Sequence, residues 1–202
     1  MKLISLPASP FARKARVMII ELGLQDQVAI VDPGMVTPVS NNDGLNSINP
    51  LGMIPTLVLE NGEGLYDSPV ICEYLNDVAE GSLFPSETSA RYKALQLQAL
   101  ADGIMDLSVA VRYELAMRPV ELHWQTFIEH QAEKISRGLA QLEKQCDEFK
   151  DEPTIGELTV ACAMGYRDFR FGEADWRADH PKLAEWFAAM MTRESLSSTI
   201  PS

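Results

Sequence analysis

Residues 49–56 read Asn49-Pro50-Leu51-Gly52-Met53-Ile54-Pro55-Thr56, a proline-containing turn that leads into a predicted strand. Pro55 stands just before a predicted strand, a place that suits proline because it cannot donate a ladder hydrogen bond. X-Pro bonds can be cis, and a cis Ile54-Pro55 bond would turn the N–H and C=O of Ile54 away from the sheet. Those groups could then pair with the backbone of a bound peptide, as an added strand does. The alternative is a trans proline in an ordinary loop.

The sequence after this stretch predicts a hairpin followed by a helix. Residues 56–59 and 64–66 have the composition of strands, and the Asn61-Gly62 step between them marks the turn. A helix is predicted from Pro69 to Val78, with Ser68 as its N-cap and the proline at its first position.

Asp67-Ser68, at the start of that helix, has the chemistry of a head-group site. The free N–H groups of a helix N-terminus and the Ser68 hydroxyl can bind an anion. Asp67 adds an acceptor for an ammonium group, and an α-amino acid presents both charges side by side. The alternative is simply a capped helix.

Upstream, the chain alternates strand and helix patterns. We expect strands at 2–6 and 28–31, and a helix from Pro10 to Leu22 that stops at Gly23. Residues 33–50 are rich in Pro, Gly, Asn and Ser and are expected to be mostly loop. The order β-α-β, loop, β-β-α indicates one α/β layer.

A second chemical motif, Ser9-Pro10-Phe11-Ala12-Arg13-Lys14, joins the first strand to the first helix. Serine is favoured at the N-cap and proline at the first helical position, so an ordinary helix start is one interpretation. In the other, the Ser9 hydroxyl faces a cleft where the helix N-terminus favours a bound anion, and a thiolate is an anion. Arg13 and Lys14 are expected on a solvated helix face.

The rest of the chain predicts helices only. Residues 81–89 contain Gly, Ser and Pro and are interpreted as a linker. Thr154 and Glu157 form a T-x-x-E capping box before an apolar run. The expected helices are 90–117, 120–149, one entered through 153–157, and 181–191. The predicted domains are an α/β domain at 1–80 and an all-helical domain at 90–202.

Composition narrows the class of partners. The chain has 202 residues, 46% of them hydrophobic and 23% charged, as in ordinary globular proteins. Its formal net charge of −12 disfavours nucleic acid and anionic membrane surfaces as partners. No apolar run approaches the roughly 20 residues that span a bilayer, and the N-terminal apolar stretch is too short for a secretory signal.

Cysteine and histidine usage predicts a reducing compartment and no metal. Cys72, Cys146 and Cys162 form no CxxC pair and are odd in number, which fits the cytoplasm. The three histidines are scattered, and none belongs to a cluster with metal-ligand spacing. We therefore expect a cytoplasmic protein without a metal.

Together these motifs resemble the cytosolic glutathione transferase family over essentially the whole chain. The Ser9 element resembles that of serine-type members, including a bacterial subgroup. Residues 49–55 resemble the family's cis-proline turn, and Asp67-Ser68 resembles its Glu/Asp-Ser pair. Thr154 matches the capping box of the family's core helix, with Glu157 where Asp is usual. The resemblance implies a thioredoxin-like α/β N-terminal domain and an all-α C-terminal domain.

The resemblance also implies where glutathione, the co-substrate, would bind. In such a site the peptide backbone pairs with Ile54, the γ-glutamyl head contacts the Asp67-Ser68 pair, and the sulfur meets the Ser9 hydroxyl. The implied glutathione-binding residues are Ser9, Phe11, Met53, Ile54, Pro55, Asp67 and Ser68.

Ser9 is the implied catalytic residue, acting as a hydrogen-bond donor to the thiolate rather than as a nucleophile. A free thiol has a pKa of about 8.5, and lowering it by about two units needs ~2.7 kcal/mol of thiolate stabilisation. A charge-assisted hydrogen bond of ~1.5–3 kcal/mol and a helix N-terminus of ~0.3–1 kcal/mol together suffice.

The chain departs from the family pattern at Met53, where many relatives carry Lys or another polar residue. A positive contact to the glycyl carboxylate is therefore missing. No cysteine stands beside Ser9, which argues against a thiol–disulfide oxidoreductase.

A second substrate is implied along the first long C-terminal helix. The candidate electrophile-pocket residues are Met105, Val109, Arg112, Tyr113 and Tyr166. A stripe of Met and aromatic residues at helical spacing is also typical of a core, which is the alternative for each of them.

The implied function is conjugation of glutathione to a small hydrophobic electrophile, in a detoxifying homodimeric enzyme. Two alternatives share every motif. One is a glutathione-dependent peroxidase or isomerase, and the other is a non-catalytic module that binds glutathione or a protein.

Overall fold

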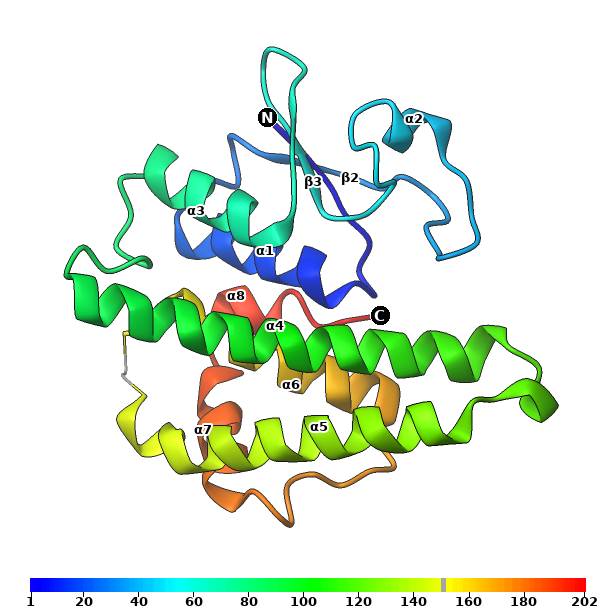
Figure 1. Ribbon diagram of the computed structural model, residues 1–202. Helices are drawn as coiled ribbons and strands as arrows, with labels where there is room; N and C mark the ends of the chain where they lie inside the picture. The colour runs from blue at the N-terminus through cyan, green and yellow to red at the C-terminus, as the bar shows by residue number, and fades with distance from the viewer. Residues whose placement is uncertain (150–151) are drawn as a thin grey trace. The chain divides into compact units, whose positions relative to one another are not determined.

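A four-stranded mixed sheet organises the first part of the chain in this computed structural model, which describes residues 1–149 and 152–202. The strand order is β2-β1-β3-β4, with β1 (Lys2–Ile4) parallel to β2 (Ala29–Val31) and antiparallel to β3 (Thr56–Val58). β4 (Gly64–Leu65) pairs with β3 through the predicted hairpin, whose turn residue Gly62 has a positive φ of 86°. The order of strands and helices along the chain confirms the predicted β-α-β and β-β-α pattern, and it can be followed by colour in Figure 1.

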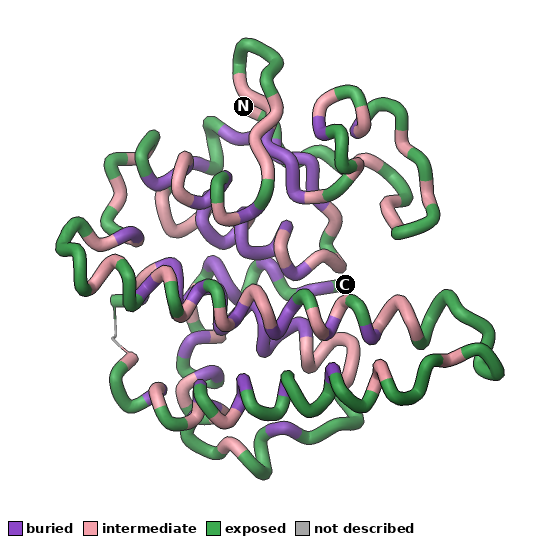
Figure 2. Tube along the Cα trace, viewed as in Figure 1, coloured by how far each residue is buried: buried purple, intermediate pink, exposed green. Residues whose placement is uncertain are grey.

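Two helices supply the other layer of this unit. α1 (Pro10–Glu21) and α3 (Ser68–Val78) pack against each other, and α3 also contacts β3. Apolar side chains between the layers, such as Leu3, Leu57 and Ile71, have no accessible surface. Figure 2 shows buried segments in this unit, and the buried positions lie in β1, β3 and both helices. The predicted α/β layer is confirmed.

The stretch 33–50 is mostly loop, as expected, and it contains a one-turn helix, α2 (Asp43–Asn46), because the Asn42 side chain accepts a backbone N–H of that turn at 3.0 Å. The expected start of the next helix is wrong. α3 begins one residue earlier than expected, with Asp67 as the N-cap and Ser68 as the first helical residue. The proline that follows suits the second helical position as well as the first, so the sequence did not distinguish the two.

Arg13 and Lys14 do not lie on a solvated face; both side chains are fully buried. The Arg13 guanidinium donates from Nη2 to the Leu196 carbonyl at 2.9 Å and from Nε to Thr199 Oγ1 at 3.4 Å. A buried charge needs such partners because its desolvation is costly. The expectation failed because the partners lie more than 180 residues away in sequence.

The other end of α1 binds the same C-terminal segment through Glu21. Its carboxylate accepts hydrogen bonds from Arg193 at 3.0 and 2.8 Å, and from the Ser195 hydroxyl. Burial alone would raise the pKa of Glu21, but the hydrogen bonds from Arg193 and Ser195, together with the Arg193 charge, hold the pKa below its ordinary value. Residues 193–202, which include α8 (Glu194–Ser197), therefore form one compact unit with residues 1–91.

Residues 92–192 form a second, helical unit. It contains most of α4 (Thr88–Met117), with α5 (Gln125–Gln145), α6 (Ile155–Phe171) and α7 (Pro181–Met190). This arrangement confirms the predicted all-helical C-terminal fold.

The predicted continuous helix over 120–149 is wrong. The chain makes a short 3-10 turn (Val120–Leu122) before α5 begins, and a second one (Cys146–Glu148) after it ends. Glu114 explains the first break, because its carboxylate accepts the backbone N–H of Trp124 at 2.8 Å and fixes the α4–α5 turn.

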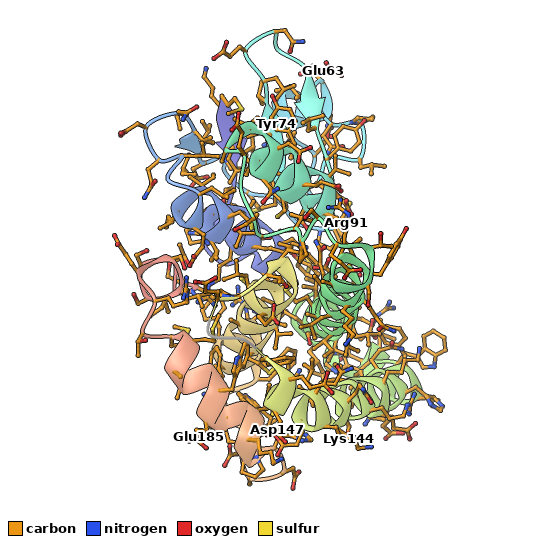
Figure 3. The ribbon with its side chains drawn as sticks, turned by 90° about the vertical axis from the view of Figure 1, so that its left-hand side faces the viewer. Glu63, Tyr74, Arg91, Lys144, Asp147 and Glu185 are labelled. Atoms are coloured by element: carbon orange, nitrogen blue, oxygen red, sulfur yellow. The ribbon has the colours of Figure 1, made fainter. Side chains whose placement is uncertain are left out.

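α7 receives its N-cap from α5. Its own N-cap residue, His180, makes no side-chain cap bond, and Glu143 instead accepts the backbone N–H groups of Lys182 and Leu183 at 3.1 and 2.8 Å. Lys182 also pairs with Asp147, which Figure 3 labels at this end of the unit. The end of α5 is thereby tied to the start of α7.

α6 is the core helix of the second unit. The predicted capping box is confirmed: Thr154 Oγ1 accepts the Gly156 N–H at 3.1 Å, and Glu157 accepts the Thr154 N–H at 2.8 Å. Every residue from Ile155 to Tyr166 is buried. Gly156 lies so close to α4 that a Cβ there would be 2.8 Å from the Ala94 carbonyl oxygen.

By length and composition, α4 alone among the helices of residues 1–149 and 152–202 could cross a membrane. The core helix of a globular unit passes the same test, and part of the apolar stretch of α4 is buried in this structure.

Substitution of two helical glycines tests the contact between α4 and α6. Gly156→Ala should lower the free energy of unfolding by about 1–3 kcal/mol, because the new methyl overlaps α4. Gly103→Ala, whose Cβ would meet nothing within 4 Å, should raise it by about 0.5–1 kcal/mol through helix propensity. Urea unfolding of both variants measures the change in the free energy of unfolding. Changes of the same sign in the two variants would contradict the close contact of α6 with α4.

Candidate functional site

Strand register brings three loops to one edge of the sheet. β1 pairs with β3 so that Ile4, its last residue, lies opposite Thr56, the first residue of β3. β3 pairs with β4 so that Leu57 lies opposite Leu65, the last residue of β4. The chain therefore leaves β1 toward Ser9, enters β3 from Pro55 and leaves β4 toward α3 at the same edge, as can be followed in Figure 1.

The loop before β3 is held by the buried side chain of Asn49. Its Nδ2 donates to the Met53 carbonyl and to Thr56 Oγ1, each at 3.0 Å, and its Oδ1 accepts the Leu51 N–H at 3.0 Å. Thr56 Oγ1 in turn donates to the Met53 carbonyl at 2.9 Å. Both side chains lie in the interior, so the loop has a fixed internal frame.

Within this frame the Ile54-Pro55 peptide bond is cis, as predicted. Pro55 is buried, whereas the side chain of Ile54 is only half-buried. Neither the N–H nor the C=O of Ile54 has a hydrogen-bond partner among residues 1–149 and 152–202. The next residue upstream, Met53, is 60% exposed. The backbone of Ile54 can thus pair with an external peptide.

The N-terminal turn of α3 also has unpartnered polar groups. Ser68 is 2% exposed, yet its hydroxyl makes no hydrogen bond within the described part of the chain. The N–H groups of Ser68 and Val70 likewise have no partner there, because the Asp67 side chain does not cap them. The Asp67 carboxylate is exposed, and the Tyr66-Asp67 peptide bond is cis. An anion at the helix start and a cation at Asp67 would complete this turn.

Ser9 is the N-cap of α1, and its hydroxyl oxygen accepts the Ala12 N–H at 3.2 Å. The hydroxyl proton is given to no acceptor in the described chain, so it remains available to a ligand. Phe11, in the first turn of α1, is half-buried. Ser9 therefore combines the two interpretations drawn from the sequence: it caps the helix as an acceptor and keeps its donor.

In the helical unit the candidate pocket residues separate into two groups. Met105 and Tyr166 are buried, at 0% and 4% exposed, whereas Val109, Arg112 and Tyr113 are half-buried on the C-terminal half of α4. Burial raises the pKa of the Tyr166 hydroxyl on α6, while the nearby charges of Arg170 and Arg112 act in the opposite direction. Arg112, Tyr113 and Tyr166 are thus brought together.

Two residues of this arrangement are not among the site residues predicted from the sequence. Asn49 belongs to the quoted motif without a predicted role, although an asparagine beside a turn commonly bonds local backbone. Arg170 lies on α6, and no local sequence signal places it near Tyr166. No group of three or more His, Cys, Asp or Glu residues could hold a metal within 1–149 and 152–202.

The chain is similar to glutathione S-transferases in both units. Its residues 8–78 match the family model for the glutathione S-transferase N-terminal domain, and residues 125–189 match that for the C-terminal domain. The uncharacterized GST-like protein YibF of Escherichia coli is 34% identical over 206 residues, covering 100% of this chain and 98% of YibF.

Solved structures of bacterial relatives are similar over the same length. A glutathione transferase family member from Pseudomonas fluorescens Pf-5 with bound glutathione is 46% identical, with a TM-score of 0.96, over 100% of this chain and 98% of that one. A second structure from that organism, with bound S-(propanoic acid)-glutathione, is 44% identical with a TM-score of 0.92; the match covers 100% of this chain and 99% of that one. A glutathione S-transferase from Methylobacillus flagellatus KT with bound glutathione is 35% identical with a TM-score of 0.90; the match again covers 100% of this chain and 99% of that one.

Replacement of Asn49 tests the frame of the loop before β3. Asn49→Ala should lower the free energy of unfolding by about 2–4 kcal/mol, because it removes three hydrogen bonds and leaves buried partners unsatisfied. Asn61→Ala, on the exposed hairpin turn, should change it by less than about 0.5 kcal/mol. Denaturant unfolding measures both, and an equal effect of the two substitutions would refute the assigned role.

Proposed function

The chain belongs to the glutathione S-transferase family, and on that premise we propose that it joins the thiolate of glutathione to a small electrophile. The observation that carries the proposal is the edge of the sheet where Ile54 and Ser68 present unpartnered polar groups beside the Ser9 loop. Glutathione has a complementary set: a peptide backbone, a zwitterionic γ-glutamyl head and a thiol.

Each part of glutathione has a proposed partner. Its cysteinyl backbone pairs with the N–H and C=O of Ile54, next to Pro55, as an added strand would. Its γ-glutamyl carboxylate takes the hydroxyl and N–H of Ser68, and its ammonium takes the Asp67 carboxylate. The backbones of relatives 35–46% identical superimpose on this chain, and these relatives hold glutathione or a glutathione conjugate, which supports the assignment.

The exposed thioether of Met53 offers no charge to the glycyl carboxylate. We propose that Phe11 and Met53 flank the ligand without an ion pair, so that affinity comes mainly from the γ-glutamyl end.

The proposed chemistry is nucleophilic attack by the glutathione sulfur on an electrophilic carbon, by displacement or by addition. Ser9 donates its hydroxyl proton in a hydrogen bond to the thiolate, and the N-terminus of α1 adds its dipole, so the thiol loses its proton to solvent near neutral pH. A sulfur lone pair then forms a carbon–sulfur bond. In displacement a leaving group departs with the electron pair of the bond that breaks; in addition the π bond breaks and its electron pair takes a proton from solvent. Val109, Arg112, Tyr113 and Tyr166 are the proposed electrophile contacts; Met105 acts from the core behind them.

Two other functions use the same site. A glutathione-dependent peroxidase or isomerase would share Ser9 chemistry, and a non-catalytic module would share only the binding groups. We favour conjugation because one relative holds a glutathione whose sulfur carries a propanoic acid group. We also propose a cytoplasmic homodimer, consistent with exposed apolar residues such as Val70 on α3.

Substitution at Ser9 separates thiol activation from helix capping. Ser9→Ala should raise the pKa of bound glutathione by about one to two units and slow conjugation of a chlorodinitrobenzene about ten- to hundredfold near neutrality, since it removes a hydrogen bond to a charged group. KM for glutathione should change little. Ser9→Thr, which keeps both hydroxyl and cap, should retain the wild-type pH profile.

The readouts are the thiolate ultraviolet absorbance and the pH dependence of kcat. If Ser9→Ala conjugates as fast as wild type at every pH, Ser9 is a helix cap and nothing more.

A further inference from the structure

Half-buried arginines on α4 and α6 lack acidic partners in a strongly acidic chain. The sequence has 29 acidic against 17 basic residues, yet Arg112, Arg167 and Arg170 form no ion pair within residues 1–149 and 152–202. The acidic neighbour on α6, Asp168, is already bound by Arg177 at 2.8 and 2.6 Å. Within the described residues, Arg112 and Arg170 therefore carry charges without an ion-pair partner.

Helix geometry places Arg112 and Arg170 at the same level of the unit. α6 touches α4 at Gly156, which lies against Ala94 and Leu97. The two helices run in the same direction in Figure 1. With a rise of about 1.5 Å per residue, Arg170 lies about 21 Å from Gly156 along the axis of α6. The same distance along the axis of α4, measured from Leu97, ends beside Arg112.

The surroundings of the two arginines agree with this placement. Tyr166, one turn before Arg170 on α6, experiences the charges of both Arg112 and Arg170 and lies near Tyr113. Two guanidinium groups and two phenolic hydroxyls therefore gather between the C-terminal halves of α4 and α6.

The guanidinium group of Arg170 stacks on an aromatic ring. The guanidinium carbon of Arg170 lies 3.9 Å from the centroid of the Phe169 ring, and its Nε is buried without a hydrogen-bond partner in the described chain. A buried donor without a partner is costly. The guanidinium also hydrogen-bonds the Tyr166 hydroxyl, so these two groups are already positioned together.

We propose that the electrophile of this protein carries a carboxylate or similar anionic group, which Arg112 and Arg170 bind while Tyr113 and Tyr166 donate hydrogen bonds to it. Arginine forks fit planar carboxylates, and a chain of net charge −12 needs such a local site to hold an anion. The inference rests on the proposed conjugation and narrows its second substrate from an apolar to an anionic electrophile.

A matched pair of electrophiles tests the inference: a chlorodinitrobenzoate and the chlorodinitrobenzamide with the same ring. In both, the thiolate forms a carbon–sulfur bond and chloride leaves with the bonding pair. Rates are divided by the uncatalysed rate of each compound. Wild type should favour the carboxylate at least about tenfold in kcat/KM, the effect expected of one charge-assisted hydrogen bond.

The variants assign that preference to the arginines. Arg112→Gln and Arg170→Gln should abolish the preference, and Arg170→Lys should keep part of it. Arg137→Gln, which removes an exposed charge on α5, should leave it intact. Calorimetric binding of glutathione should stay unchanged in all four and verifies that each is folded.

The outcomes separate the inference from the function on which it rests. Wild type that conjugates both compounds equally, or Arg112→Gln and Arg170→Gln proteins that bind glutathione and keep the preference, overturn the inference alone. Wild type that conjugates neither compound overturns the proposed function and the inference together.

Discussion

The buried carboxamide of Asn49 is the interaction on which the candidate site depends. Its three hydrogen bonds fix the turn that precedes β3, and Thr56 closes the same network onto the Met53 carbonyl. Because these groups satisfy one another inside the turn, they need nothing from outside. The turn can therefore leave the backbone of Ile54 unpaired at the surface without losing its own shape.

The rule that buried polar groups find partners then locates the ligand. At this edge of the sheet the polar groups inside the turn are hydrogen-bonded to one another. The backbone of Ile54, the Ser68 hydroxyl and the first N–H groups of α3 have no partner in the described chain. The Ser9 hydroxyl accepts one hydrogen bond and donates none. A glutathione molecule would satisfy all of these groups at once, which is why the family and the geometry lead to the same proposal.

Local signals in the sequence were sufficient wherever a few neighbouring residues determine the conformation. The Pro55 turn, the hairpin at Gly62 and the Thr154–Glu157 capping box are of this kind, and the structure confirms their geometry. The burial of Arg13 could not be predicted, because its partner carbonyl at Leu196 is distant in sequence. Contacts between segments that are distant in sequence leave no local sequence signal. The proximity of Arg112 on α4 and Arg170 on α6 could not be predicted for the same reason.

Calorimetric titration compares glutathione with cysteinylglycine, which lacks the γ-glutamyl group. Most of the affinity should come from Asp67, Ser68 and the start of α3, because each makes hydrogen bonds with a charged group of the ligand. Glutathione should therefore bind, and the dipeptide should bind at least about a hundredfold more weakly. Equal affinities for the two, or no binding of glutathione at all, would contradict the account.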